Sequence, residues 1–458
     1  MEEPDLKTLL EQALQYSKEY IDSMPGRMVY PSEEAIWNLD GLDVPLSLEG
    51  YPATETLALL HRQGSPATVA QTGGRYFGFV NGGAHPAGLA ARWLADTWDQ
   101  NAALYAMSPV VSKLEAICEK WLVDLFRLPK DSAMGLVSGT STALICGLVA
   151  GRNHLLEKQG WNVSENGLMG APELNVVISE HAHATVLKAL SLIGLGRRKV
   201  FKVPCDDQGR MKIEALPEFN SFTLVVAGAG EVNSGSFDDM KAICARANSA
   251  GAWVHIDGAF GLWAGASKST YHLFDGAEQA NSWSVDAHKT LNVPYDCGIV
   301  LCRNRSSLIS SLHASGSYIQ WSENRDGMLY TTEMSRRARA VELWAVLRTL
   351  GRNGIESLVD QLCARAKLFA NLLRDAGFKI MNDVTFNQVL IAGASNDETQ
   401  RTLEYLQKSG VCWCSGSVWK QQSVIRISIC SWMTSERDVI LSAEAFIEAR
   451  TMAQSVKP

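Results

Sequence analysis

The chain is organised around residues 282–302, which read Ser-Trp-Ser-Val-Asp-Ala-His-Lys-Thr-Leu-Asn-Val-Pro-Tyr-Asp-Cys-Gly-Ile-Val-Leu-Cys. Two segments, Trp283–Val285 and Gly298–Cys302, are apolar and rich in β-branched residues, which predicts two short strands. The proline between them prevents a helix, so His288 and Lys289 lie in a turn at a strand edge. Most lysines on loops are solvated surface residues. A partly desolvated lysine amine, however, is a nucleophile toward an aldehyde.

The composition predicts a globular protein of two to three domains. The 458 residues are 46% hydrophobic and 20% charged, without a low-complexity tract, so disorder is not expected. The formal charge of −7, with no basic cluster longer than residues 336–339, argues against nucleic acid as a partner. No stretch approaches about 18 apolar residues. The acidic start Met1–Asp5 is unlike a secretory signal, so we expect a cytoplasmic protein with no membrane association.

The ten cysteines lie mostly inside apolar segments, and none has the spacing of a zinc site. We expect reduced core residues and no bound metal. A redox role for Cys412 and Cys414 is the weaker alternative.

Strand-like runs alternate with helical segments through the middle of the chain, as in Thr185–Gly194 and Asp238–Ala250. This alternation predicts an α/β fold, with a mostly parallel sheet flanked by helices and a ligand crevice at the carboxyl ends of its strands. The expected strands are Asn175–Ser179, Thr223–Ala227, Trp253–Asp257, Trp283–Ala287 and Gly298–Cys302.

The two ends of the chain have different patterns. Residues 5–24 predict an amphipathic helix, and the Pro-, Gly- and Ser-rich stretch 25–74 predicts an extended arm. Toward the C-terminus, two helices are expected over 332–351 and 355–376, followed by a small α/β unit. Its strands are predicted near 388–392 and 423–430. We therefore expect an N-terminal dimerisation arm over 1–84, a large domain over 85–354 and a small C-terminal domain over 355–458.

Polar side chains that could bind a ligand or take part in catalysis follow the predicted strands. After the short strand Gly135–Val137, the turn Ser138–Thr142 opens a helix, and such a turn offers backbone N–H groups and hydroxyls to a phosphate. Simple N-capping is the commoner explanation of such a turn. Four further groups follow the other strands and can share one site with this turn: His181 and His183, Glu231–Asn233, Asp257, and His288 with Lys289.

Asp257 is the strongest single indication of a cofactor. An aspartate directly after a buried strand is costly without a cationic or hydrogen-bonding partner, and a pyridinium nitrogen is such a partner. Pyridoxal 5'-phosphate offers that nitrogen to Asp257, a phosphate to the 138–142 turn, an aldehyde to Lys289 and a flat ring on which His183 stacks. Each residue taken singly has a structural explanation, and only the set favours the cofactor.

The chain resembles the group II pyridoxal-phosphate-dependent amino acid decarboxylases, the aromatic-L-amino-acid and glutamate decarboxylase family, from Phe77–Pro86 to Arg426–Thr434. The resemblance implies the aspartate-aminotransferase-like fold (fold type I). It implies a homodimer with its active site at the interface and the N-terminal arm exchanged between subunits. It also implies these roles: Lys289 forms the Schiff base, Ser141, Thr142 and His288 hold the phosphate, His183 stacks on the ring, Asp257 pairs with the ring nitrogen, Ala259 lies beneath the ring, and Asn233 lies near the cofactor.

The resemblance favours a carboxy-lyase that converts an L-amino acid to an amine and carbon dioxide. An apolar lining from residues 76, 77, 79, 98 and 104 would suit an aromatic or large aliphatic substrate. The alternatives are a decarboxylating oxidative deaminase (aldehyde synthase), an aminotransferase and, least favoured, a non-catalytic binding protein. An aminotransferase would need an arginine to clamp the carboxylate, whereas we expect Arg426 to serve the small domain or the subunit interface.

The remaining site residues concern the substrate and its proton donor. Family members of animals and plants use a loop tyrosine to protonate the substrate carbon, and the corresponding segment 321–330 here looks shorter. Tyr330 is therefore the candidate proton donor, and the segment is a candidate lid. We expect Phe79 and His85 to contact the substrate, His85 through a polar substituent.

Overall fold

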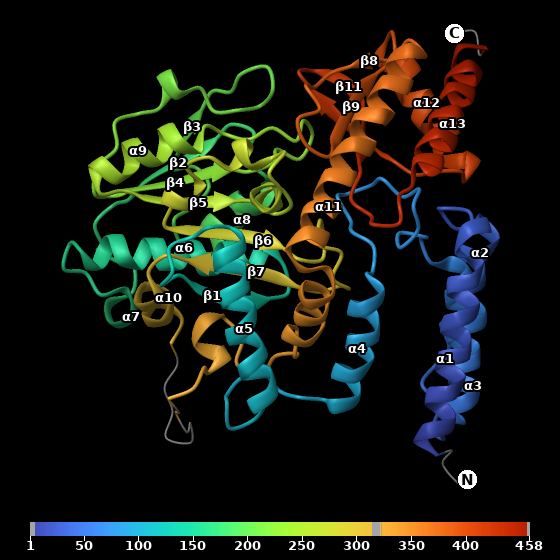
Figure 1. Ribbon diagram of the computed structural model, residues 1–458, viewed down its shortest axis with the longest axis horizontal. Coiled ribbons are helices and arrows are strands. Elements are labelled where there is room, and N and C mark those ends of the chain that lie inside the picture. Colours follow the sequence, from blue (N-terminus) through green and yellow to red (C-terminus); the bar gives the residue numbers. More distant parts are fainter. Residues whose placement is uncertain (1–4, 314–320, 322, 456–458) are drawn as a thin grey trace.

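The computed structural model describes residues 5–313, 321 and 323–455. Its larger sheet has seven strands in the order β1-β7-β6-β5-β4-β2-β3 (Figure 1). The strands from β6 to β3 are parallel neighbours, whereas β7 is antiparallel to both β6 and β1. The predicted α/β fold with a mostly parallel sheet is confirmed. The strands are β1 (Ala133–Val137), β2 (Asn175–Ser179), β3 (Val200–Val203), β4 (Thr223–Gly228), β5 (Trp253–Asp257), β6 (Ser282–Asp286) and β7 (Gly298–Cys302).

Helices flank this sheet (Figure 1), and α6 (Thr140–Glu157) packs closely on it. Two glycines of α6 make this packing close. A Cβ on Gly147 would lie 2.6 Å from the ring of His255, and one on Gly151 would lie 2.8 Å from the ring of Trp253. The other helices of this region are α4 (Pro86–Trp98), α5 (Pro109–Leu125), α7 (Val163–Asn166), α8 (Ala184–Leu192), α9 (Met240–Ala250) and α10 (Arg305–Leu312).

A second, antiparallel sheet has its own hydrophobic core and the order β10-β11-β9-β8. The long helix α11 (Ala340–Asp375) leads into it and is interrupted at Gly351, whose φ of 58° is left-handed. The sequence predicted two helices here, and the break lies at their junction, although the first begins at Ala340 rather than Thr332. The remaining elements are β8 (Lys379–Ile380), β9 (Gln388–Ala392), α12 (Asn396–Ser409), β10 (Ser415–Trp419), β11 (Gln422–Ser428) and α13 (Glu436–Ser455).

The N-terminal region is more helical than the sequence predicted. After α1 (Leu6–Ser23), the stretch expected to be extended contains α2 (Glu33–Trp37) and α3 (Ala53–Gly64). These helices lie beside the rest of the molecule rather than within it (Figure 1). Apolar side chains are left exposed there, among them Trp37, Leu46 and Leu48. Among the described residues, no helix combines the length and apolar character that crossing a bilayer requires.

A buried histidine stands in the middle of the larger sheet. The His255 ring is fully buried on β5, with Nδ1 2.7 Å from the Ser282 hydroxyl and Nε2 3.2 Å from the Ser284 hydroxyl, both on β6. Burial disfavours the charged imidazolium and lowers the pKa of His255 to about 3. The neutral ring is therefore part of the folded state.

This histidine makes stability depend on pH. In the unfolded chain the pKa of His255 returns to about 6.5, so below that pH the unfolded state binds a proton that the folded state excludes. The free energy of unfolding should fall by on the order of 1 kcal/mol per pH unit from about pH 6 toward the folded pKa. Between about pH 7 and about pH 5, the thermal midpoint should fall further in the wild type than in His255→Gln. Equal losses would show that another group titrates.

Candidate active site

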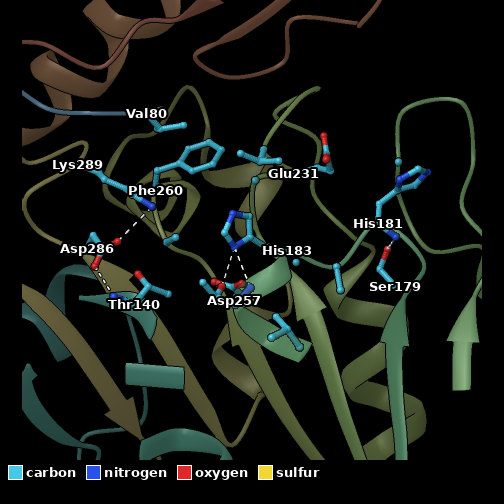
Figure 2. Close-up of a pocket in the computed structure, with 18 of the residues that line it drawn as sticks. Val80, Thr140, Ser179, His181, His183, Glu231, Asp257, Phe260, Asp286 and Lys289 are labelled. Carbon is cyan, nitrogen blue, oxygen red and sulfur yellow. Dashed lines mark hydrogen bonds and ion pairs between the residues drawn. The ribbon is translucent and has the colours of Figure 1, made fainter. Parts of the chain in front are cut away.

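A cavity of about 550 Å³ opens where four parallel strands end (Figure 2). The last residues of β2, β4, β5 and β6 all line it: Ser179, Gly228, Asp257 and Asp286. The opposite wall comes from the second sheet, through Ser415 and Gly416 of β10 and Arg426 of β11. The cavity therefore lies between the two sheets, at the edge where parallel α/β sheets bind ligands.

Lys289 is held over this cavity by a carboxylate. Its Nζ lies 3.2 Å from Oδ2 of Asp286, whose Oδ1 accepts a hydrogen bond of 2.7 Å from the backbone N–H of Thr140 (Figure 2). The same Oδ2 is 3.6 Å from Nε2 of His288. Nδ1 of His288 accepts from the backbone N–H of Cys297, so in the neutral ring the proton is on Nε2. Burial lowers the pKa of His288, and Asp286 opposes that shift.

The turn that carries Lys289 is fixed by Asn292. This fully buried side chain donates through Nδ2 to the carbonyls of Thr290 and Cys430, and its Oδ1 accepts from the backbone N–H groups of Gly83 and Trp432. Its φ of 59° is left-handed, a region that asparagine tolerates better than most residues. One amide therefore joins the turn to two segments that are distant in sequence.

Asp257 presents an unpaired carboxylate oxygen at the base of the cavity. Its Oδ1 is buried and has no hydrogen-bond partner among the described residues. Burial raises the pKa of Asp257, while His183 and Lys289 act to lower it. His183 caps α8, and its Nδ1 is bonded to the hydroxyl and N–H of Thr185, so the ring stands in the cavity near Asp257 (Figure 2).

Four buried polar atoms without hydrogen-bond partners among the described residues belong to residues lining this one cavity. They are Thr140 Oγ1, Asp257 Oδ1, Ser415 Oγ and Arg426 Nε. Each such atom costs free energy unless a ligand or water satisfies it. The set contains one anionic acceptor, one cationic donor and two hydroxyls. A ligand with both a cationic and an anionic group matches it.

Comparisons with known proteins agree with this geometry. A family model described as the pyridoxal-dependent decarboxylase conserved domain matches residues 67–392. The chain belongs to this family. It is 25% identical to tryptophan decarboxylase 1 of Oryza sativa subsp. japonica, over 95% of this chain and 91% of that one. It is 27% identical to phenylacetaldehyde synthase of a Rosa hybrid cultivar, over 83% and 80%. The crystal structure of Oryza sativa TDC with PLP and tryptamine superposes with a TM-score of 0.89 at 23% identity, covering 98% of each chain.

The residues present fit pyridoxal 5'-phosphate, the cofactor of this pyridoxal-dependent decarboxylase. The unpaired Asp257 Oδ1 suits a protonated ring nitrogen, because a buried carboxylate needs a cationic partner. At the start of α6, the Thr140 hydroxyl has no hydrogen-bond partner in the part of the chain that the structure describes, and Ser141 lines the cavity, which suits a phosphate. The Lys289 amine faces the same space.

The structure brings most of the predicted site residues together. Seven line the cavity: Phe79, Ser141, His183, Asp257, Ala259, His288 and Lys289. Two others lie just behind its wall. The Thr142 hydroxyl is bonded to that of Ser138, and Thr142 does not line the cavity as its neighbour Ser141 does. Asn233 donates to Glu231 and accepts from the Ser417 hydroxyl, so Glu231 rather than Asn233 faces the space.

Two predicted residues lie elsewhere. His85 does not line the cavity and instead caps α4, with Nδ1 accepting from the N–H of Ala87. Tyr330 is also absent from the cavity wall. It is 7% exposed, bonded through its hydroxyl to Arg305 and covered by the guanidinium of Arg325 at 3.9 Å from the ring centre. Its expected role as proton donor does not agree with this position. The candidate lid, residues 321–330, includes residue 322, which lies outside the described residues.

Sequence reasoning missed three residues of the site. Asp286 was quoted only as part of the turn, although an aspartate three residues before the lysine could have suggested an ion pair. Asn292 gave no signal, because three of its partners, Gly83, Cys430 and Trp432, are distant in sequence. Arg426 was assigned to the small domain or the subunit interface, but its buried guanidinium lines the cavity, and the one hydrogen bond it donates to a described residue is a long bond of 3.5 Å to the Val232 carbonyl.

Asp257→Asn tests the role of the unpaired oxygen. The variant should fold and retain some cofactor, but turnover should fall about a thousandfold or more, because a neutral amide cannot hold a proton on the ring nitrogen. The matched control is Asp238→Asn. Asp238 also lines the cavity, but its carboxylate already accepts from the N–H groups of Gly228 and Met211, so its loss should lower stability rather than turnover. Near-normal turnover of Asp257→Asn would remove Asp257 from this role.

Proposed function

We propose that the protein decarboxylates an aromatic or large apolar L-amino acid to the corresponding amine and carbon dioxide. The observation that carries this proposal is the buried, unpaired carboxylate of Asp257 in one cavity with Lys289. Apolar side chains that could contact such a substrate line the same space: Phe79, Val80, Val186 and Phe260. The similarity to tryptophan decarboxylase 1 also supports an aromatic substrate.

Different residues of the chain would bind different groups of the cofactor. When bound, pyridoxal phosphate supplies a protonated ring that accepts the electrons released as the bond between Cα and the carboxylate breaks. Asp257 would hold the proton on the ring nitrogen, and the start of α6, with Thr140 and Ser141, would hold the phosphate. Lys289 would bind the aldehyde, while the ion pair with Asp286 positions its Nζ. His183 would cover the ring face and exclude water.

Aminotransfer is the second candidate function, and Arg426 is the observation that favours it. Burial lowers the pKa of Arg426, and none of the ion pairs formed by described residues satisfies its guanidinium. A guanidinium facing the cavity could hold the substrate carboxylate near the ring plane, which favours loss of a proton over loss of carbon dioxide. The similarity to phenylacetaldehyde synthase supports a third product pattern, aldehyde formation in air.

The assembly is part of the same proposal. We expect a cytoplasmic homodimer in which residues 1–84 form the dimerisation arm, 85–354 the large domain and 355–458 the small domain. The exposed apolar side chains of the arm, including Trp37, Leu46 and Leu48, support a subunit contact, because a second copy would remove them from water.

The cofactor should be attached to Lys289. Borohydride reduction of the purified protein, followed by proteolysis and mass spectrometry, should place the pyridoxyl group on the peptide that contains Lys289. Lys289→Ala should lose this attachment and all measurable turnover. The control is Lys268→Ala, which changes a lysine outside the cavity and should be labelled like the wild type. A pyridoxyl group on another lysine would end the assignment.

The products decide among the three reactions. With an aromatic L-amino acid under anaerobic conditions, each substrate consumed should yield one carbon dioxide and one amine, with no 2-oxo acid. The same assay in air should give the same products. Aldehyde, ammonia and hydrogen peroxide as the main products in air would indicate an aldehyde synthase. A 2-oxo acid that appears only with an added acceptor would indicate an aminotransferase.

A further inference from the structure

A second group of potential ligands lies at the side of the cavity away from Lys289. The residues that follow β2, Glu180 and His181, meet Cys205 in the loop after β3. One carboxylate oxygen, one ring nitrogen and the thiol sulfur all lie within 4.8 Å of one another. His181 lines the cavity and is labelled on this side in Figure 2. Thiolate, imidazole and carboxylate are the ligands that zinc-like divalent ions prefer.

Local hydrogen bonds position Glu180 and Cys205, and they leave atoms of the group that could still bind a metal. The Glu180 Oε1 accepts a 2.6 Å hydrogen bond from the Cys205 backbone N–H, and the Ser179 hydroxyl lies 3.1 Å from the Cys205 sulfur. The His181 backbone N–H donates to the Ser179 hydroxyl. Neither ring nitrogen of His181 has a hydrogen-bond partner among the described residues, although the ring stacks on Trp419 at 5.3 Å. The exposed imidazole can therefore offer a ring nitrogen to a metal.

The charge around the group also favours a cation. The carboxylates of Asp238 and Glu180 both place negative charge near the Cys205 sulfur. A divalent ion would offset this negative potential and take the place of the thiol proton. Cys205 is the one cysteine of the ten that is not buried, so it is also the thiol that an ion can reach.

We propose that Glu180, His181 and Cys205 form a binding site for a zinc-like divalent cation, with a fourth position left for water. The ion would join the end of β2 to the loop after β3, beside Trp419 of the second sheet. The sequence predicted no metal because its cysteines lack the spacing of a known zinc motif. This group does not follow such a motif, since only the fold brings Cys205 close to Glu180 and His181.

Cobalt binding to the holoenzyme tests the proposal. Addition of Co²⁺ should give one equivalent of bound metal and a thiolate-to-cobalt charge-transfer band in the near ultraviolet. Zn²⁺ should remove that band and protect one fast-reacting thiol from a thiol reagent. In Cys205→Ser the band and the fast thiol should both be absent, with an unchanged circular dichroism spectrum showing that the variant folds.

Two carboxylate variants complete the test. Glu180→Gln keeps an oxygen that can accept from the Cys205 N–H but loses the charge, and should weaken Co²⁺ binding about tenfold or more. Glu173→Gln removes an exposed carboxylate paired with Lys199 elsewhere on the surface and should bind like the wild type. Cobalt bound without the thiolate band, or bound equally by the wild type and Cys205→Ser, would overturn the proposal.

Discussion

The buried amide of Asn292 is the contact on which the arrangement of the site depends. It bonds to backbone groups of the Lys289 turn, of the segment around Gly83 and of residues 430–432 that follow β11. A buried polar group left without its partner costs about 1–3 kcal/mol, so these bonds strongly favour one relative position of the three segments. Gly82 shows how close they come, since a Cβ there would lie 2.1 Å from the Lys289 carbonyl. The second sheet is thereby held against the cavity that the first sheet opens.

Two aspartates at neighbouring strand ends illustrate how partners decide a role. Asp286 ends β6 and is satisfied by Lys289 and by the N–H of Thr140. Asp257 ends β5 and keeps one oxygen without a hydrogen-bond partner in the described part of the chain. The first carboxylate therefore organises the protein, and the second is available to a ligand. Residue type and position at a strand end are the same for both, and only the tertiary contacts distinguish them.

Such tertiary contacts also explain which parts of the fold and the site could be predicted from the sequence. The alternation of strands and helices located β2, β5 and β7 to the residue, because burial on both faces gives continuous apolar runs. It also placed Asp257, His183 and Lys289 at one edge, because parallel strands end together. Ser141 and Thr142 are neighbours in α6, but they point in different directions around the helix, and only Ser141 lines the cavity. The motif alone cannot show which of the two faces the ligand. The position of Tyr330 depends on Arg305 and Arg325, and these pair with Glu115 and Glu119 of α5, a network between segments distant in sequence.

The antiparallel placement of β7 beside β6 has a consequence for the lysine. Asp286 pairs with Gly298, so residues 287–297 form a loop whose two ends are joined by the ladder between these strands. The other strand ends at the cavity lead away into helices or longer connections. Local loss of order in this loop would expose Leu291 and Val293, which are fully buried, and would leave the buried Asn292 amide without its partners, so it would cost free energy. Amide hydrogen exchange around Lys289 should therefore follow opening of the central sheet rather than local fluctuation.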